Sequence, residues 1–197
     1  MNSAEAFALD SILPFRAGEC LVRPVVVGDF ESFLAMQTDP ASKGGWAIKS
    51  SRAELVSELR PDFTSRQDLA AIESPSGRFA GYITLTPVND PADPYALDVA
   101  INAMWMFLRP EWQRRGYGLK IAQHVLAEAF KSIEAIHAQS KLADSQESSF
   151  LIRLGFRLLY KDLMGTAWWC IDRSEFFARR ESDADRYKPS STSKSHP

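Results

Sequence analysis

The sequence predicts a single α/β domain built on a mixed sheet, and three observations support this prediction. The 197 residues suffice for a real core, and contents of 45% apolar and 24% charged residues are ordinary for a soluble globular protein. Short runs typical of strands stand among longer segments with apolar residues at helical spacing. Their order, β-α-α-β-β-β-α-β-α-β-β, indicates a mixed layer and not a regular βαβ repeat.

The first half of the chain supplies three strands and two helices. Residues 1–17 show no sustained period, so we expect a poorly ordered lead-in. Asp29 and Ser51 are residue types that cap helices, and each precedes apolar residues at helical spacing. The expected elements are a strand over 20–25, helices beginning after Asp29 and after Ser51, and strands over 69–73 and 79–85 around a Pro-Ser-Gly turn.

The second half supplies the remaining strands and the most regular helix. From residue 179 onward the chain is rich in Ser, Lys, Asp and Pro, which predicts a disordered tail over 179–197. The folded domain is therefore expected to span 18–178. The expected elements are a strand over 97–108, a helix over 116–131, a strand over 133–139, a helix over 145–154, and strands over 156–160 and 166–172.

The composition excludes several classes of function. A formal net charge of −2 gives no basic footprint for nucleic acid or an anionic membrane. Cys20 and Cys170 are too few for a disulfide framework and are expected to be buried free thiols, and the scattered histidines form no metal motif. The start of the chain lacks the basic residues of a signal peptide, and no apolar run is long enough to span a bilayer. A cytoplasmic protein is the default expectation.

One motif carries chemistry, at the junction of the long strand and the helix over 116–131. The first-turn amides of a helix lack intrahelical partners, and the helix dipole adds partial positive charge there. Two glycines let the backbone approach a ligand closely, and two arginines add positive charge, so a diphosphate is the expected guest. The residues of this loop are Gln113, Arg114, Arg115, Gly116, Tyr117 and Gly118.

Three matches in order make the chain resemble the GCN5-related N-acetyltransferase (GNAT) superfamily over residues 19–173. The first is Leu21-Val22-Arg23-Pro24 followed by Asp29 and Asp39-Pro40. The second is the loop over 113–118, and the third is Leu154-Gly155-Phe156 after the late helix. Within the superfamily, the pattern is similar to that of the ribosomal-protein N-terminal acetyltransferases.

The resemblance implies a fold and a cofactor. In a GNAT-like fold, the fourth and fifth strands splay apart, and acetyl-CoA lies in the cleft between them. Its pantetheine arm pairs with the main chain of the fourth strand, which here implies the backbone of Phe107 and Leu108. The loop over 113–118 would hold the pyrophosphate, and no metal is expected.

The catalytic residues depart from the family's pattern. Leu151 stands where many members carry a Tyr that protonates the departing thiolate. A Ser one turn earlier serves some relatives, and here the hydroxyl nearest to that position is Ser148, which we favour as the donor. Ala103 stands where several relatives carry a Glu as the base. Asp98 and Glu73 are the alternative bases, and a water chain without a dedicated carboxylate is a third.

The implied function is transfer of acetyl from acetyl-CoA to a primary amine, either a protein N-terminus or a small amine. Trp46 lies in the Gly-rich loop that overhangs the acceptor site in the family and is the expected wall of that site. The missing Tyr and Glu leave a non-catalytic acyl-CoA-binding module as the alternative. A homodimer, the acyl-chain preference and the identity of the amine are left open.

Overall fold

The computed structural model describes residues 7–38, 52–88, 101–141, 145–161, 163 and 165–186. Eight strands form one sheet in the order β1-β2-β3-β4-β5-β6-β8-β7. Every neighbouring pair is antiparallel except β5 and β6, which run parallel. The strands are β1 (Phe15–Ala17), β2 (Cys20–Pro24), β3 (Leu69–Glu73), β4 (Phe79–Val88), β5 (Ile101–Leu108), β6 (Ala135–Lys141), β7 (Arg157–Lys161) and β8 (Thr166–Asp172).

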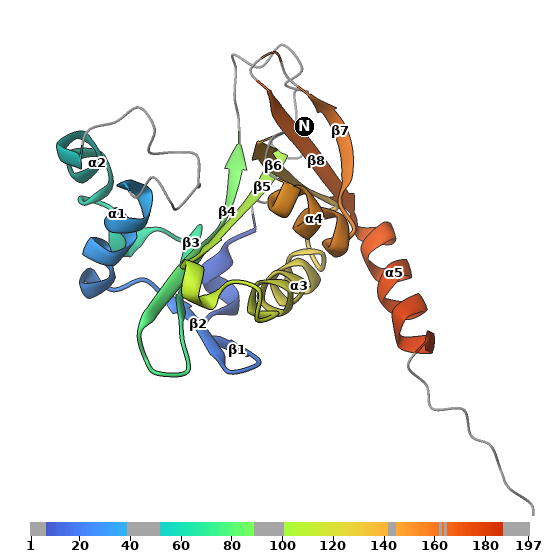
Figure 1. The fold of residues 1–197 in the computed structure, drawn as a ribbon, viewed down its shortest axis with the longest axis horizontal. Helices are drawn as coiled ribbons and strands as arrows, with labels where there is room; N and C mark the ends of the chain where they lie inside the picture. Colours follow the sequence, from blue (N-terminus) through green and yellow to red (C-terminus); the bar gives the residue numbers. More distant parts are fainter. Residues whose placement is uncertain are drawn as a thin grey trace, which may run out of the picture.

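Helices cover both faces of the sheet, and the prediction of a mixed α/β layer is confirmed (Figure 1). The α-helices are α1 (Phe30–Thr38), α2 (Arg52–Leu59), α3 (Tyr117–Ala129), α4 (Ser145–Leu154) and α5 (Arg173–Arg186). Short 3-10 turns are η1 (Leu9–Ile12), η2 (Val27–Asp29), η3 (Phe63–Ser65) and η4 (Pro110–Trp112). None of the helices in these ranges has both the length and the apolar character needed to cross a membrane.

The core is divided by the sheet into two clusters because side chains alternate along a strand. On β4, Ile83 and Leu85 are buried against α3 and α4, whereas Tyr82 packs with the aromatic residues Phe33 and Phe63 of the α1 and α2 side. Both predicted free thiols, Cys20 and Cys170, are buried. The larger cluster lies on the side of α3, which positions that helix firmly against the sheet.

The start of the described chain differs from the predicted lead-in. Residues 15–17 form β1, an edge strand paired with β2, and Leu9 in η1 is fully buried. His124 of α3 stacks on Phe15, with ring centroids 4.0 Å apart. A strand of three residues is too short to show an alternating pattern in the sequence, so it is recognised only from its pairing with β2.

The end of the described chain also differs, because α5 extends to Arg186. The predicted boundary at 178 falls inside this helix, which is mostly charged. Phe176 is buried in the larger core cluster beside Phe130, with ring centroids 5.3 Å apart. The prediction of a disordered tail was therefore wrong for residues 179–186, and residues 187–197 lie outside the described ranges.

The packing of α5 leads to a stability prediction. We expect Phe176→Ala to lower the free energy of unfolding by about 3 kcal/mol or more, because a buried phenyl ring is replaced by a cavity. Phe177→Ala is the matched control. Phe177 is 39% exposed, so its truncation should lower the free energy of unfolding clearly less. Urea denaturation of both variants measures the difference. Equal losses would show that α5 is not anchored through Phe176.

Candidate active site

The start of α3 has the geometry predicted for an anion site. Gly116 precedes the helix in a left-handed conformation with φ 80°, and no side chain among the described residues caps the helix. Its first turn carries no acidic residue of its own that would offset the positive end of the helix dipole. Arg114 also has a positive φ of 58°, which is a strained conformation for a residue with a side chain. Such strain is typical of loops shaped to bind a ligand.

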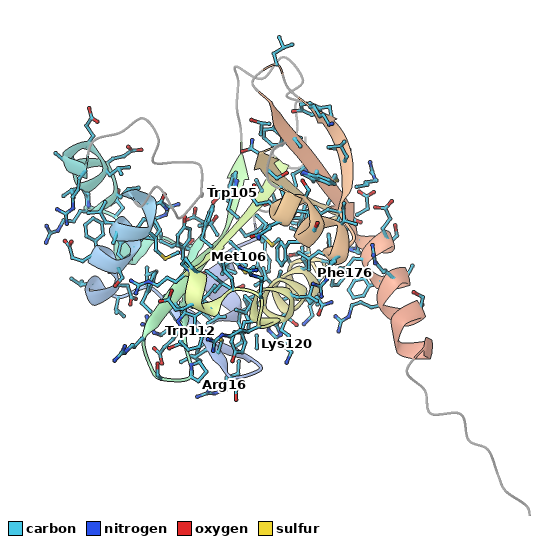
Figure 2. All side chains as sticks on the ribbon, in the orientation of Figure 1. Arg16, Trp105, Met106, Trp112, Lys120 and Phe176 are labelled. Carbon is cyan, nitrogen blue, oxygen red and sulfur yellow. The ribbon has the colours of Figure 1, made fainter. Side chains whose placement is uncertain are left out.

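Positive charge gathers around this helix end. Arg114 and Arg115 are exposed, and the Arg115 guanidinium lies 5.0 Å from the ring centre of Trp112. Figure 2 shows Trp112 and Lys120 on the side of the molecule where α3 begins, with Arg16 of β1 close by. None of the salt bridges within the described part of the chain involves these four cationic side chains. They remain available to an anionic ligand.

Three contacts hold the loop in place. The side chain of Gln113 donates to the main-chain oxygen of Leu108 at 2.7 Å. The Tyr117 hydroxyl donates to the Glu19 carboxylate at 2.7 Å, and this hydrogen bond raises the pKa of Tyr117. A Cβ on Gly118 would lie 3.0 Å from the end of the Met106 side chain, so glycine lets α3 pack closely on β5. Gln113 and Tyr117 thus position the loop, while Gly116 and Gly118 keep it open.

Strands β5 and β6 diverge next to this loop. Their ladder contains two pairs, Asn102 with Ile136 and Ala103 with His137. Beyond Ala103, β5 continues to Leu108 and β6 continues to Lys141 without pairing to each other (Figure 1). The predicted splay of the fourth and fifth strands is therefore present, as β5 and β6. A main chain without a strand partner can pair with an extended ligand.

The orientation of β5 corrects one predicted contact. The amide of Arg109 donates to Ala80 of β4 at 2.8 Å, and main-chain groups of an antiparallel edge alternate in direction. Phe107 therefore directs its N–H and C=O toward β4, where it is paired with Tyr82. Met106 and Leu108 direct theirs toward the gap. The predicted pairing of pantetheine with the backbone of Phe107 does not fit this orientation, whereas the pairing with Leu108 stays a prediction. Met106 was not predicted, because the direction depends on a register that the sequence does not display.

Ser148 is the predicted donor that the structure brings toward the divergent part of β6. Its hydroxyl oxygen lies 3.4 Å from that of Ser140, which also accepts a hydrogen bond from the Trp169 indole at 2.9 Å. Ser149 is exposed, and Leu151 is buried in the core. Phe150, from the same helix α4, lies near Gly118. The helix that carries Ser148 therefore contacts the start of α3.

We expect Ser148→Ala to lower turnover by about tenfold or more and to leave the affinity for acetyl-CoA nearly unchanged. The reason is that a hydroxyl near the sulfur would assist departure of the thiolate, whereas a thiolate also leaves moderately well unaided. Tyr160 is the comparison, because it lies on β7 stacked against Trp168 and Tyr160→Phe should do less. Steady-state kinetics of both variants measures this. The reverse ranking would place the donor on β7.

Glu73 is not brought to the point where β5 and β6 part. It ends β3 beside Phe79, at the end of the sheet where β5 also ends. Its carboxylate accepts a hydrogen bond from Arg23 at 2.7 Å, and Arg23 also binds Asp29. This network joins β2, β3 and the turn before α1, so Glu73 has a structural role. The other two predicted residues, Asp98 and Trp46, lie outside the described residues.

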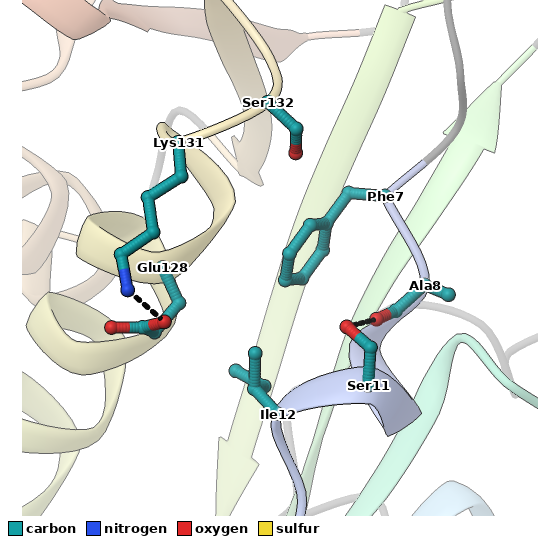
Figure 3. A pocket seen from close by; sticks show the side chains of 7 residues that line it. All are labelled: Phe7, Ala8, Ser11, Ile12, Glu128, Lys131 and Ser132. Carbon is teal, nitrogen blue, oxygen red and sulfur yellow. Dashed lines mark hydrogen bonds and ion pairs between the residues drawn. The ribbon is translucent and has the colours of Figure 1, made fainter.

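A surface pocket of about 330 Å³ lies elsewhere, between η1 and the end of α3 (Figure 3). Its Lys131 is paired with Glu128 at 2.6 Å, and Phe7 and Ile12 line the opposite wall. Eleven residue steps separate Glu128 from the start of α3, or about 16 Å of helix. The pocket is thus remote from the anion site. The described residues also contain no group of His, Cys, Asp and Glu that could hold a metal ion.

Comparisons with known proteins agree with this geometry. The acetyltransferase (GNAT) domain profile matches residues 20–157. No curated protein matches significantly. An acetyltransferase from Agrobacterium tumefaciens is similar in fold, with a TM-score of 0.63, 16% identity, and coverage of 81% of this chain and 94% of that one.

Two further solved structures share the fold. A GCN5-related N-acetyltransferase from Brucella melitensis has a TM-score of 0.61 at 18% identity, covering 89% of this chain and 86% of that one. Spermidine N-acetyltransferase from Vibrio cholerae, solved with CoA and spermine, has a TM-score of 0.64 at 12% identity, covering 81% and 98%. With a profile match over most of its length, the chain belongs to the GNAT family of acetyl-CoA-dependent acetyltransferases.

Proposed function

We propose that this protein transfers the acetyl group of acetyl-CoA to a primary amine. The observation that carries the proposal is the alignment of two sites along β5. The uncapped, cationic start of α3 follows the end of β5, and the main chain of Met106 and Leu108, which has no strand partner toward β6, leads from it toward the last β5–β6 pair. A diphosphate at the first site would let an extended pantetheine arm pair with the second.

The residues of the loop would have different roles in binding the cofactor. First-turn amides of α3 and the side chains of Arg114 and Arg115 would bind the pyrophosphate, and Gly116 would let it approach the backbone. Gln113 and Tyr117 would hold the loop in place and not contact the pyrophosphate through their side chains, because each is already hydrogen-bonded within the protein. Acetyl-CoA supplies the activated acyl group as a thioester, and no metal is part of this proposal.

Two classes of amine are candidates for the acetyl acceptor. The motif around Arg23 and Asp29 resembles that of ribosomal-protein N-terminal acetyltransferases, which suggests a protein N-terminus as the acceptor. In support, Arg23 binds Asp29 at 2.7 Å and so fixes the start of α1, the helix next to the expected acceptor side. The Vibrio cholerae relative acts, by its name, on spermidine, so a small polyamine is the second class.

Release of free thiol from acetyl-CoA tests the proposal and separates the acceptors. The panel should contain peptides with free N-termini, spermidine, an aminoglycoside and single amino acids, each with and without enzyme. The proposal predicts amine-dependent release with one class clearly preferred. Tight binding of acetyl-CoA without release for any amine would instead favour a non-catalytic acyl-CoA-binding module, to which the absence of a hydroxyl at Leu151 points.

A further inference from the structure

The last pair of the β5–β6 ladder joins Ala103 and His137. Directly paired residues of neighbouring strands point to the same face of the sheet, about 4.8 Å apart. On β6, Ile136 and Ala138 face the larger core cluster, so His137 faces the opposite side. The methyl group of Ala103 cannot accept a proton. The imidazole of His137 therefore stands beside the point at which the two strands part.

A row of paired residues crosses the sheet at this level, and His137 is the base within it. Thr86 pairs with Ala103, and Cys170 pairs with His137. The Thr86 hydroxyl donates to Asp68 at 2.7 Å, and Arg66 binds the same carboxylate. Burial raises the pKa of Cys170 to about 11, so its thiol is neutral. Neither flanking residue can take a proton near neutral pH.

The His137 ring has an unused nitrogen. Its Nδ1 is buried and has no hydrogen-bond partner among the described residues. A buried polar atom without a partner is costly, which indicates that water or a ligand completes it. Asn102, in the other ladder pair, also has a buried oxygen without a partner, but an amide is not a base.

Burial favours the neutral form of His137. Burial lowers the pKa of His137, and Arg157 of β7 acts in the same direction. The Asp172 carboxylate of β8 acts in the opposite direction, more weakly than burial but more strongly than Arg157. No described residue of β5 adjacent to Ala103 is charged. A neutral imidazole at working pH has one nitrogen with a free lone pair, as a general base requires.

We propose that His137 is the general base of acetyl transfer, an inference that rests on the proposed function. The arm that begins at the loop and follows β5 from Leu108 to Ala103, a length of about 16 Å, brings the thioester to this point. The amine nitrogen attacks the carbonyl carbon, forming the C–N bond while its proton passes to the imidazole. The C–S bond breaks, and its electron pair leaves on sulfur. The thiolate then takes a proton from water, either directly or through the Ser148 hydroxyl, which regains a proton from water as it gives up its own, and the imidazolium releases its proton to solvent.

The test compares His137→Gln with two matched variants on the best amine of the panel. At pH 7 we expect His137→Gln to lower kcat/KM about 100-fold with an unchanged Kd for acetyl-CoA. His124→Gln changes a histidine on α3 that stacks on Phe15 and should stay within twofold of the wild type. Asp98→Asn should lower kcat/KM less than His137→Gln does. The reverse ranking, or a His137→Gln rate within twofold of the wild type, would overturn the proposal.

The pH dependence separates a base from a structural residue. The wild-type kcat/KM should fall with acid through a pKa below 6.5, where the base becomes protonated. In His137→Gln this limb should disappear, and its deficit should shrink as pH approaches the pKa of the amine itself. Imidazole added to His137→Ala should restore part of the rate. An unchanged acid limb in His137→Gln would contradict the assignment.

If these variants do not fold, the wild-type protein still tests the role of His137. NMR titration of histidine-labelled wild type should show His137 titrating at the same pKa as the acid limb, and a different value would contradict the proposal. Wild-type protein inactive on every amine would reject the proposed function itself. If the wild type is active but the rate does not depend on His137, only this inference is rejected.

Discussion

Gly116→Asp is expected to abolish acetyl-CoA binding, raising Kd by about 100-fold or more, while the fold is retained. A Cβ at Gly116 meets no atom of the described residues within 4 Å, so the side chain would stand in the open space before α3. Its carboxylate would occupy the region proposed for the diphosphate and repel it, in a place where the helix dipole otherwise favours an anion. Calorimetric titration with acetyl-CoA measures the effect.

Gly165→Asp is the control for this change. Gly165 has nearly the same φ, 83° against 80°, and a Cβ there also meets nothing within 4 Å in the part of the chain that the structure describes. It precedes β8 and not α3, so the same backbone strain and the same added charge should leave acetyl-CoA binding close to wild type. Wild-type affinity in Gly116→Asp, or equal losses in both variants, would contradict the assignment of the pyrophosphate site.

Gly81→Ala is expected to lower the free energy of unfolding by about 3 kcal/mol and to weaken acetyl-CoA binding as well. A Cβ at Gly81 would overlap the main-chain oxygen of Phe107 and lie 3.0 Å from the Leu108 Cα. Both are backbone atoms of β5, so the strand end must move, and with it the main chain that faces the gap.

Gly28→Ala provides the comparison for Gly81→Ala. A Cβ at Gly28 meets nothing within 4 Å and its φ is not in the left-handed region, so stability should change by less than about 0.5 kcal/mol. Urea denaturation and calorimetry measure the two effects separately. Full stability in Gly81→Ala would mean that the end of β5 yields easily and is a poor template for an extended ligand.

The sequence predicted those parts of the fold whose signals are local. The helix α3 follows a glycine-containing loop and has a continuous apolar face, so its position could be anticipated, and its proposed binding role rests on the same loop. β1 and α5 could not. β1 is three residues long and is defined by its pairing with β2, and α5 is anchored chiefly by Phe176 in a mostly charged segment.

The candidate site could be proposed from the sequence where a loop forms it, and less so where strand register determines it. The backbone of Phe107 and Leu108 was expected to pair with the cofactor, but the alternation that turns Phe107 toward β4 follows from its pairing with Tyr82. Glu73 could be placed at the end of a strand, yet its ion pair with Arg23 joins residues 50 positions apart. His137 has no motif around it, and only the parallel pairing with Ala103 places it where the strands part.

Amide hydrogen exchange with and without acetyl-CoA tests most directly where the cofactor binds. We predict that acetyl-CoA slows exchange at the first turn of α3 and at Met106, whose amide faces the gap, and changes little at Phe107, whose amide already faces β4. Protection confined to the pocket between η1 and the end of α3, with none at Met106 or the start of α3, would contradict the account.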